Sequence, residues 1–577
     1  MLIPRFGIGF SLIAFLPWVL RFLAGYLPFQ RTPFDWLIAI FLVTAWVGYW
    51  AAYDESAAWI KYWLIVSTIL FYYAFSAQPK QNLTFLSFLS FCFAVALSLY
   101  FCLTYDFSGR GGRFALWWMN YRPHIDWPAI DPDYVSGLVL IGTIWAFFWL
   151  WTTGKKLFGS APVVMQVFLL SGIGVVALVF VLTLSRAIAF IGLGLVGLWF
   201  LWKVSTLVGY TLRVRAVFPV LVLGYLVVLI TFAYLGQANA VPGSPQSNYG
   251  RNSRAEVLGR VSYFLVDYPI TGAGLASFPG LYSQYMLVIP YPYLTNSYNL
   301  FLDVTTEQGV IAGSILITLY LGSVFLVSWS IAIDPSNELR SMRWLALFAL
   351  FVAIVHGCFY DYLYNGNGTG LLFFPLGMAM MGVVNRDHAR DGVVQLPKAL
   401  SRLNLTMIAL PVLALILIFV VNINMVISRW YSNLGALQMS KAELKNFPAN
   451  QWATSDMVYR LEPAESTLQI ALQYDPRNQT ANYRLAMISM IRRDFKSAEA
   501  NLETAYQEAP NHRGIIKNLG YAYVWLGEFD KAQALLDYIP ESQKEMSVYI
   551  WWWDTQSRPD LSENASMMVS RLNTSSQ

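Results

Sequence analysis

Charged side chains are scarce in this chain. Only 12% of its 577 residues are Asp, Glu, Lys or Arg, whereas 57% are hydrophobic and the mean hydropathy is +0.49. Soluble domains carry about 25% charged residues, so this composition excludes an ordinary soluble protein. The net charge of +5 is small for the length and gives no basis for nucleic-acid binding.

Cysteines are few, and cofactor-binding motifs are missing. The chain has only three cysteines and each lies in an apolar segment, so we expect neither a disulfide nor a metal site. It contains no P-loop, dinucleotide fingerprint, zinc motif or nucleophile elbow. These absences argue against nucleotide-driven chemistry, and we expect no cofactor.

What the chain has in abundance is apolar sequence. Segments of about 18 residues or more recur through its first three quarters, each long enough to cross the ~30 Å hydrocarbon layer of a membrane. The sequence predicts about twelve spans, at residues 8–26, 34–51, 58–77, 84–104, 134–152, 162–183, 187–202, 216–236, 309–331, 343–361, 369–385 and 404–428. The predicted fold is therefore all-α, with a polytopic helical membrane domain over residues 1–428.

The short loops between these spans predict the orientation. Basic clusters fall on one side, at residues 80, 155–156, 203–215, 340–343 and 386–402. The positive-inside rule assigns that side to the cytoplasm. Alternation then places loops 105–133 and 237–308 on the outer side, together with residues 429–577. Arg5 is the exception, because the same alternation places it outside.

Residues 429–577 are polar and helix-forming, and they contain an internal repeat. Pro476 and Pro510 are 34 residues apart, as are Ala498 and Ala532. This period is typical of tetratricopeptide repeats, and weaker helical segments flank it at 464–475 and 541–553. Such stacks offer a concave surface to a protein partner, which we expect here; a structural cap without a partner is the alternative.

The long polar loop that begins near residue 251 carries the arginines best suited to chemistry. Arg254 and Arg260 lie in it, and Arg186 ends a predicted span on the outer side, against the usual bias. Guanidinium groups bind phosphate oxygens in bidentate pairs, so these arginines predict a binding site for an anionic headgroup such as a lipid-linked diphosphate. A snorkelling arginine and an ordinary solvated loop are the alternatives.

A second candidate group lies where this loop re-enters the membrane. Asn299, Asp303 and Glu307 are spaced at i, i+4 and i+8, so they share one face of a helix. That face is suited to positioning an acceptor hydroxyl and taking its proton. The alternative is a hydrogen-bonded helix start capped by Thr295 or Asn296.

The outer loop 105–133 combines Arg122 and His124 with Trp117 and Trp118. Aromatic faces with polar neighbours suit sugar stacking, although tryptophans beside a bilayer are more often interface anchors. Both interpretations stay open at the level of sequence.

The motifs together resemble those of the O-antigen ligase and polymerase superfamily, which are membrane glycosyltransferases with a GT-C-like fold. The Ser-Arg pair ending in Arg186 resembles the family's outer-face Ser-Arg element. Arg254, fifteen residues before Pro269, resembles the arginine that precedes the family's Pro-x-x-Gly-x-Gly element, here residues 269–274. Glu307 with Gly309 resembles its Glu-x-Gly segment. The resemblance covers most of residues 30–430.

The resemblance implies a donor glycan linked to undecaprenyl diphosphate, with Arg186 and Arg254 binding the diphosphate. It implies transfer to a lipid or protein acceptor at the outer face of a bacterial inner membrane, with a periplasmic C-terminal domain. The family's histidine, which assists acceptor attack, is Tyr298 here, next to Asn299. A tyrosine with a pKa of about 10 is a poor base at neutral pH, which leaves Asp303 and Glu307 as candidates, or a reaction that needs little base.

These observations support three hypotheses. The leading one is a ligase-like glycosyltransferase, with an O-antigen or exopolysaccharide polymerase of the same superfamily as its alternative. The second is a non-catalytic scaffold for glycan assembly, which the missing histidine favours. A transporter ranks lowest, because no pair of Gly- or Pro-broken spans occupies matching positions in two halves.

Overall fold

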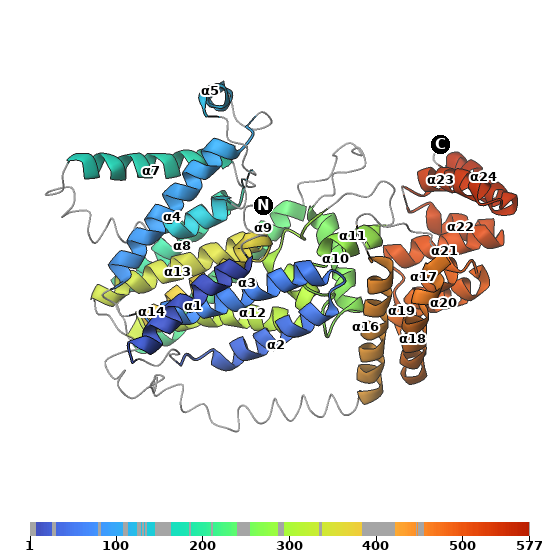
Figure 1. The fold of residues 1–577 in the computed structure, drawn as a ribbon, viewed down its shortest axis with the longest axis horizontal. Helices are drawn as coiled ribbons and strands as arrows, with labels where there is room; N and C mark the ends of the chain where they lie inside the picture. Colours follow the sequence, from blue (N-terminus) through green and yellow to red (C-terminus); the bar gives the residue numbers. More distant parts are fainter. Residues whose placement is uncertain are drawn as a thin grey trace.

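The computed structural model describes residues 7–25, 31–78, 82–107, 113–123, 129, 132, 135–144, 163–183, 186–208, 212–238, 254–286, 294–333, 337–383, 422–445, 447, 455–539 and 541–575. Within these ranges the regular structure is helical throughout, which confirms the all-α prediction (Figure 1).

The N-terminal part of the chain forms an apolar bundle. Its helices are α1 (Gly7–Leu23), α2 (Asp35–Ala51), α3 (Glu55–Ser76), α4 (Leu83–Thr104), α5 (Arg113–Tyr121), α7 (Val163–Thr183), α8 (Arg186–Val208), α9 (Leu212–Ala238), α10 (Arg254–Asp267), α11 (Phe278–Met286), α12 (Leu300–Ile333), α13 (Asn337–Gly357), the 3-10 helix η2 (Gly366–Leu371) and α14 (Phe374–Val383). The predicted outer loop 237–308 thus contains two helices of its own, α10 and α11.

Helix α12 is the centre of this bundle. It packs against α2, α9, α13 and α14, and Leu316, Leu319, Tyr320 and Val324 along it are fully buried. A helix that is apolar on all sides must be surrounded by other protein segments or by lipid. This explains why α12 combines high hydropathy with extensive burial.

Fewer helices than predicted meet the requirements for crossing a membrane. Three helices in the described part of the chain are long and apolar enough, namely Glu55–Ser76, Phe85–Thr104 and Leu300–Ala332. Eight further apolar helical stretches extend over only 10–17 residues each in that part. The prediction of about twelve spans is therefore corrected to three candidate spans among the described residues. One physical reason is that helices end inside predicted spans: α14 occupies only Phe374–Val383 of the predicted span 369–385. The predicted span 404–428 lies mostly outside the described residues.

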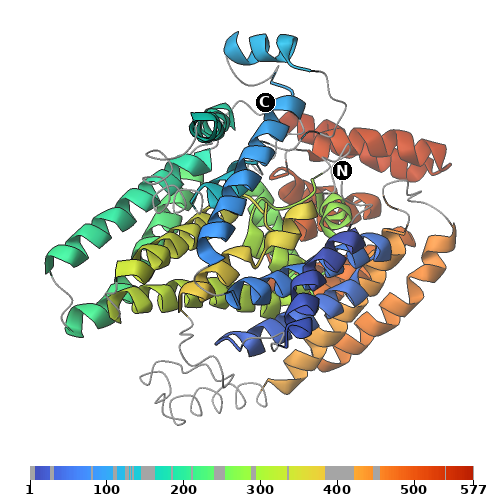
Figure 2. The same ribbon diagram turned by 60° about the vertical axis from the view of Figure 1, so that its left-hand side comes forward.

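The C-terminal part begins with α16 (Ile423–Glu443), which runs across the predicted domain boundary at residue 428 and packs on α18. The remaining helices are α17 (Ser455–Arg460), α18 (Glu462–Tyr474), α19 (Gln479–Ile491), α20 (Phe495–Glu508), α21 (Arg513–Leu526), α22 (Phe529–Leu536), α23 (Ser542–Thr555) and α24 (Pro559–Ser575). In Figures 1 and 2, α16 lies between the bundle and the other C-terminal helices.

Successive helices pair as the 34-residue period predicted. Helix α19 packs on α20, α21 on α22 and α23 on α24, and α20 contacts α21 so that the pairs form one stack. Small residues allow the close approach: Ala498 and Ala532 are fully buried, and a Cβ on Gly520 would lie only 2.6 Å from Leu536 Cδ2. The repeat prediction is confirmed, and α18 and α23 correspond to the weaker helical flanks.

Candidate functional site

Two motifs that are far apart in the sequence interlock in the structure. The first is the turn at residues 269–274, called here the glycine turn, and the second is the segment 306–310 of α12. Ala273 N donates to Thr306 O at 2.7 Å, Gly274 N donates to Glu307 O at 3.1 Å, and Val310 N donates to Pro269 O at 2.9 Å. Backbone groups released by the irregular turn are thereby satisfied by the helix, as buried backbone requires.

Glycine is required on both sides of this contact. Gly309 interrupts α12 with φ 86° and ψ 170°, and a Cβ there would lie 2.4 Å from Ile270 O. Gly272 has φ 68°, and its Cβ would lie 2.4 Å from the backbone of Glu307. Only a residue without a side chain combines this backbone conformation with this approach. The glycine turn and the segment 306–310 thus form one structural unit.

Glu307 is held by a lysine from α3. Its Oε2 lies 2.7 Å from Lys61 Nζ, and the two side chains are only 5% and 11% exposed. Lys61 Nζ also lies 3.8 Å from the ring centre of Tyr364, whose hydroxyl accepts a 2.7 Å hydrogen bond from Gln308 Nε2. A buried charge in an apolar bundle is costly unless it is paired, and the pairing of Glu307 with Lys61 supplies that partner.

Asp303 has a different environment one helical turn away. It is 3% exposed, and its Oδ1 accepts a 2.9 Å hydrogen bond from Ser297 N. Its Oδ2 is buried without a hydrogen-bond partner among the described atoms. Asp361 and Glu307 are the acidic groups that interact electrostatically with it. Asp303 therefore has an acceptor oxygen to offer, whereas the Glu307 carboxylate is already engaged.

The residues before Asp303 start the helix. Asn299 Oδ1 accepts hydrogen bonds from Phe301 N (3.1 Å) and Leu302 N (3.0 Å), which is the geometry of an N-cap. The cap is thus Asn299 rather than Thr295 or Asn296. Because its side chain turns back on the backbone, Asn299 does not share the face of Asp303 and Glu307.

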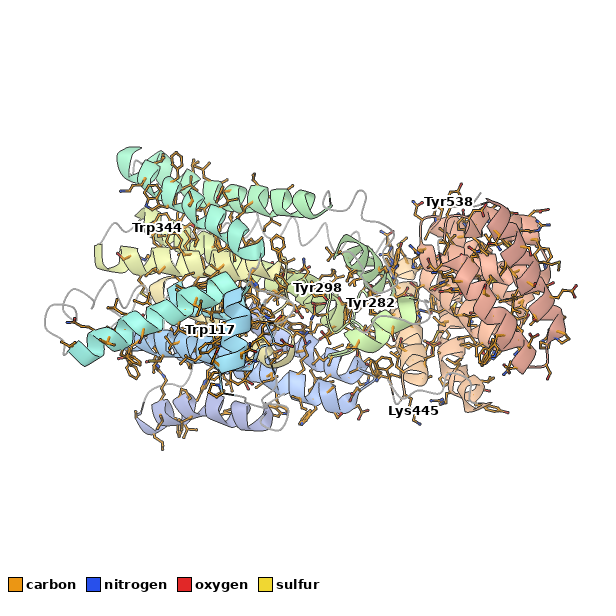
Figure 3. The ribbon with its side chains drawn as sticks, turned by 90° about the horizontal axis from the view of Figure 1, so that it is seen from above. Trp117, Tyr282, Tyr298, Trp344, Lys445 and Tyr538 are labelled. Atoms are coloured by element: carbon orange, nitrogen blue, oxygen red, sulfur yellow. The ribbon has the colours of Figure 1, made fainter. Side chains whose placement is uncertain are left out.

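Tyr298 has the unusual φ of 60° and is half-buried against the bundle core. A non-glycine residue in this backbone region is held there by its surroundings and is common at functional sites. Figure 3 shows Tyr298 at the end of the bundle that faces the C-terminal helices, with Trp344 toward the opposite end.

Arg186 and Arg254, which are predicted to bind the diphosphate, are called here the arginine clamp, and the structure describes only their backbone. Arg186 is the first residue of α8 and Arg254 the first residue of α10. Their side chains lie outside the described atoms. Arg260, two turns along α10, has a half-buried side chain. Both helix starts favour anions, because unpaired N–H groups and the helix dipole add positive potential there.

Two of the outer-loop candidates, Arg122 and Trp118, make structural contacts. Arg122 Nη1 donates to Cys102 O at 2.9 Å and to Tyr105 O at 2.7 Å, which caps the end of α4. Trp118 Nε1 donates to the same Cys102 carbonyl at 2.8 Å. These contacts account for both residues without a sugar. His124 lies outside the described residues.

The C-terminal domain holds the glycine turn from its other side. Asn433 on α16 accepts at Oδ1 from Ile270 N (3.1 Å) and Thr271 N (3.2 Å), and its Nδ2 donates to Thr271 Oγ1 at 2.8 Å. The Asn433 amide therefore uses both acceptor positions of its oxygen and one of its two N–H donors in hydrogen bonds to two residues of the turn. A single side chain of α16 fixes the conformation next to Gly272.

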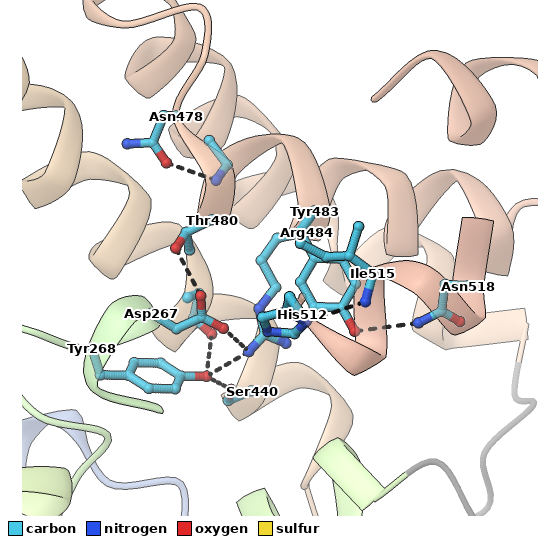
Figure 4. A network of polar contacts seen from close by, with 12 residues as sticks. Asp267, Tyr268, Ser440, Asn478, Thr480, Tyr483, Arg484, His512, Ile515 and Asn518 are labelled. Carbon is cyan, nitrogen blue, oxygen red and sulfur yellow. Dashed lines mark hydrogen bonds and ion pairs between the residues drawn. The ribbon is translucent and has the colours of Figure 1, made fainter. Parts of the chain in front are cut away.

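A second contact reaches the turn from the repeats (Figure 4). Asp267, the last residue of α10, accepts from Arg484 Nη2 and from Thr480 Oγ1, both at 2.7 Å. The next residue, Tyr268, shares a 2.6 Å hydrogen bond with Ser440. Nearby, burial raises the pKa of Glu443 to about 7. No local sequence pattern predicted this network, because α10 and the helix that carries Arg484 are more than 200 residues apart.

Sequence patterns also gave no prediction for Lys61, Gln308 or Tyr364. Lys61 did leave a signal, since it is a lone basic residue inside the apolar helix Glu55–Ser76. Intramembrane charges of this kind mark functional sites or their supports. Among the residues with described positions, no group of three or more His, Cys, Asp or Glu side chains is arranged to hold a metal ion.

Comparison with known proteins identifies one part of the chain. A tetratricopeptide repeat family model matches residues 489–548, which correspond to α20 through the first half of α23. No curated protein and no solved structure matches the chain. Residues 489–548 therefore contain tetratricopeptide repeats, a class of helical stack that commonly binds other proteins.

Proposed function

We propose that this protein transfers a glycan from an undecaprenyl-diphosphate-linked donor to an acceptor at the outer face of a bacterial inner membrane. The observation that carries the proposal is the interlock of the glycine turn with Glu307 and Gly309. It joins the two segments on which the resemblance to O-antigen ligases and polymerases rests, and it does so beside buried acidic side chains. The C-terminal repeats then lie on the periplasmic side, because they contact the turn directly.

The reaction assigns a role to each group. The acceptor hydroxyl oxygen attacks the anomeric carbon of the donor, forming the new glycosidic bond, while the bond from that carbon to the diphosphate breaks. The bonding electrons leave with the diphosphate oxygen, whose charge Arg186 and Arg254 neutralise, with Arg260 nearby. The hydroxyl proton passes to Asp303, because Glu307 is engaged by Lys61.

The test is the glycan profile of a deletion strain complemented with wild type, Arg254→Ala or Arg254→Lys. Cell-surface glycan and lipid-linked precursor are compared on gels. Loss of all attached glycan with accumulation of long lipid-linked chains identifies a ligase or protein glycosyltransferase, and loss of long chains alone identifies a polymerase. Arg254→Lys is expected to lose most activity, because lysine cannot reproduce the guanidinium fork. Full rescue by either variant would show that the Arg254 guanidinium is not required for transfer.

A second candidate function is a non-catalytic scaffold for glycan assembly. The specific observation in its favour is Tyr298, which replaces the histidine of the resembling family and is held at a positive φ. On this hypothesis, Tyr298→Ala and Asp303→Ala leave glycan output unchanged, whereas removal of residues 440–577 abolishes it. Glycan output in the Tyr298→Ala and Asp303→Ala strains therefore decides between the two functions.

A further inference from the structure

A pocket of about 430 Å³ opens where α2 ends beside α16. Its lining residues are Trp46, Val47, Tyr49, Trp50, Glu55 and Lys441. We propose that this pocket binds a sugar residue of the glycan substrate. The proposal deepens the glycosyltransferase function and rests on it for the identity of the glycan, but binding itself is measurable without turnover.

The lining combines exposed aromatic faces. Trp46 and Trp50 are 52% and 51% exposed, and Tyr49 stands between them in the sequence. Behind them, rings from α3 keep the surface rigid: Tyr62 lies 5.4 Å from Trp46, and Trp59 lies 5.4 Å from Tyr49, between ring centres. The electron-rich faces of aromatic rings attract the weakly positive C–H groups of a pyranose, and a rigid platform lowers the entropy cost of binding.

Two charged groups supply the polar part of the site. Lys441 comes from α16, where its Nζ donates to Trp50 O at 2.6 Å and lies 5.4 Å from the Trp50 ring centre. Glu55 begins α3 and interacts electrostatically with Lys441. An ammonium with further donors and a carboxylate acceptor are what vicinal hydroxyl groups require. An apolar pocket with a few convergent polar groups is the usual form of a small-ligand site.

The pocket adjoins the interlocked motifs through one turn of α2. Gly48, between two lining residues, accepts a 2.9 Å hydrogen bond from Leu275 N at the end of the glycine turn. A Cβ on Gly48 would lie 3.1 Å from Glu307 O, so this side of the helix is pressed against the candidate site. On α3, Lys61 pairs with Glu307 while its neighbour Tyr62 supports the aromatic platform. A glycan held in the pocket would thus be separated from Glu307 by the end of α2.

Aromatic residues at a membrane surface also serve as interface anchors, and this alternative makes a different prediction. An anchor needs neither a concave site nor a lysine contributed by the C-terminal domain. Trp36, at the other end of α2, is 83% exposed and lines no part of the pocket. It provides a control for a tryptophan of the same helix with anchoring chemistry only.

The test is saturation-transfer difference NMR on the full chain in phosphatidylcholine nanodiscs, which avoids sugar-headed detergents. The probes are maltotriose, cellotriose and tri-N-acetylchitotriose at millimolar concentration. Wild type is expected to give signals from at least one trisaccharide. Trp50→Leu and Lys441→Met are expected to reduce them at least fivefold, whereas Trp36→Leu leaves them unchanged.

Two outcomes would overturn the proposal. One is the absence of signal from all three sugars with the wild-type protein, and the other is a signal that survives in both pocket variants. Arg254→Lys separates this inference from the proposed reaction: if that variant binds sugar and also keeps full glycan output, the pocket stands and the arginine clamp falls. If the variant binds sugar but loses glycan output, the results support both sugar binding in the pocket and diphosphate binding by Arg254.

Discussion

Arg484 and Asp267 are 217 residues apart in the sequence, yet they form an ion pair with 2.7 Å between Nη2 and Oδ2. Their side chains are only 5% and 4% exposed. Asp267 lies two residues before Pro269, so the pair joins the repeat domain to the start of the glycine turn. The repeat domain is therefore part of the candidate site's support as well as a platform for partners.

Arg484→Ala is expected to loosen the glycine turn, because it leaves the Asp267 carboxylate buried without its partner. Breaking a buried ion pair from one side costs about 3–5 kcal/mol. Hydrogen–deuterium exchange of residues 267–274 should accelerate by at least tenfold. Arg492→Ala is the control, since Arg492 pairs with Glu465 at the surface, where a pair contributes about 0–1 kcal/mol. Equal exchange in the two variants would contradict this role of Arg484.

Stability of the domain contact is expected to fall as pH rises from 5 to 8. Burial raises the pKa of Glu443 to about 7 from its ordinary 4.5, so the folded state holds this proton more tightly than the unfolded chain. The stabilisation is complete below pH 4.5 and is lost as the pH rises through about 7. Glu443→Gln should flatten this part of the melting-temperature profile, whereas exposed Glu563→Gln should leave it as in wild type. An unchanged slope in Glu443→Gln would refute the assignment.

Gly309→Ala is expected to separate the interlocked motifs, because the new Cβ meets Ile270 O and the backbone φ of 86° disfavours alanine. We expect transfer activity in membrane vesicles to fall at least tenfold, with increased proteolysis near residue 270. Gly224→Ala is the matched control. Nothing lies within 4 Å of its Cβ, and alanine in a helix interior gains about 0.5–1 kcal/mol over glycine. Wild-type activity in Gly309→Ala would show that the break in α12 is dispensable.

Lys61→Met and Glu307→Gln are expected to be strongly coupled. Each single change leaves one buried charge without its partner, at a cost of about 3–5 kcal/mol, whereas the double variant leaves none. In the double-mutant cycle, read from chemical unfolding in detergent, the double variant should be less destabilised than either single variant, which corresponds to a coupling energy of more than about 3 kcal/mol. Additive effects would show that the two side chains do not depend on each other.

Asp303→Asn is expected to slow transfer by at least ~100-fold, the usual contribution of a general base. The amide oxygen still accepts the hydrogen bond from Ser297 N, so the melting temperature should stay within a few degrees of wild type. Transfer rate and melting temperature are measured on the same membrane preparation. An unchanged rate would show that Asp303 does not accept the proton. Another group would then be the base, or the protein would be a non-catalytic scaffold.

Sequence patterns determined the features that depend on neighbours along the chain. The helical class follows from the apolar composition, and the repeats follow from the 34-residue spacing that aligns Ala498 with Ala532, both fully buried. Gly309 and the glycine turn were singled out through the family resemblance, and the structure supplies the reason for glycine there, namely a positive φ. Such rules act over a few residues or one repeat, so a single sequence contains them.

Tertiary structure decided which distant groups meet. Lys61 neutralises Glu307 across 246 positions, which leaves Asp303 as the carboxylate with an unengaged oxygen. Asn299 became a helix cap rather than part of an acceptor face, and Asn433 and Arg484 fixed the glycine turn from the C-terminal domain. The strength of these interactions depends on burial and on the direction of each donor. Both quantities exist only once the helices have packed, and no spacing in the sequence encodes them.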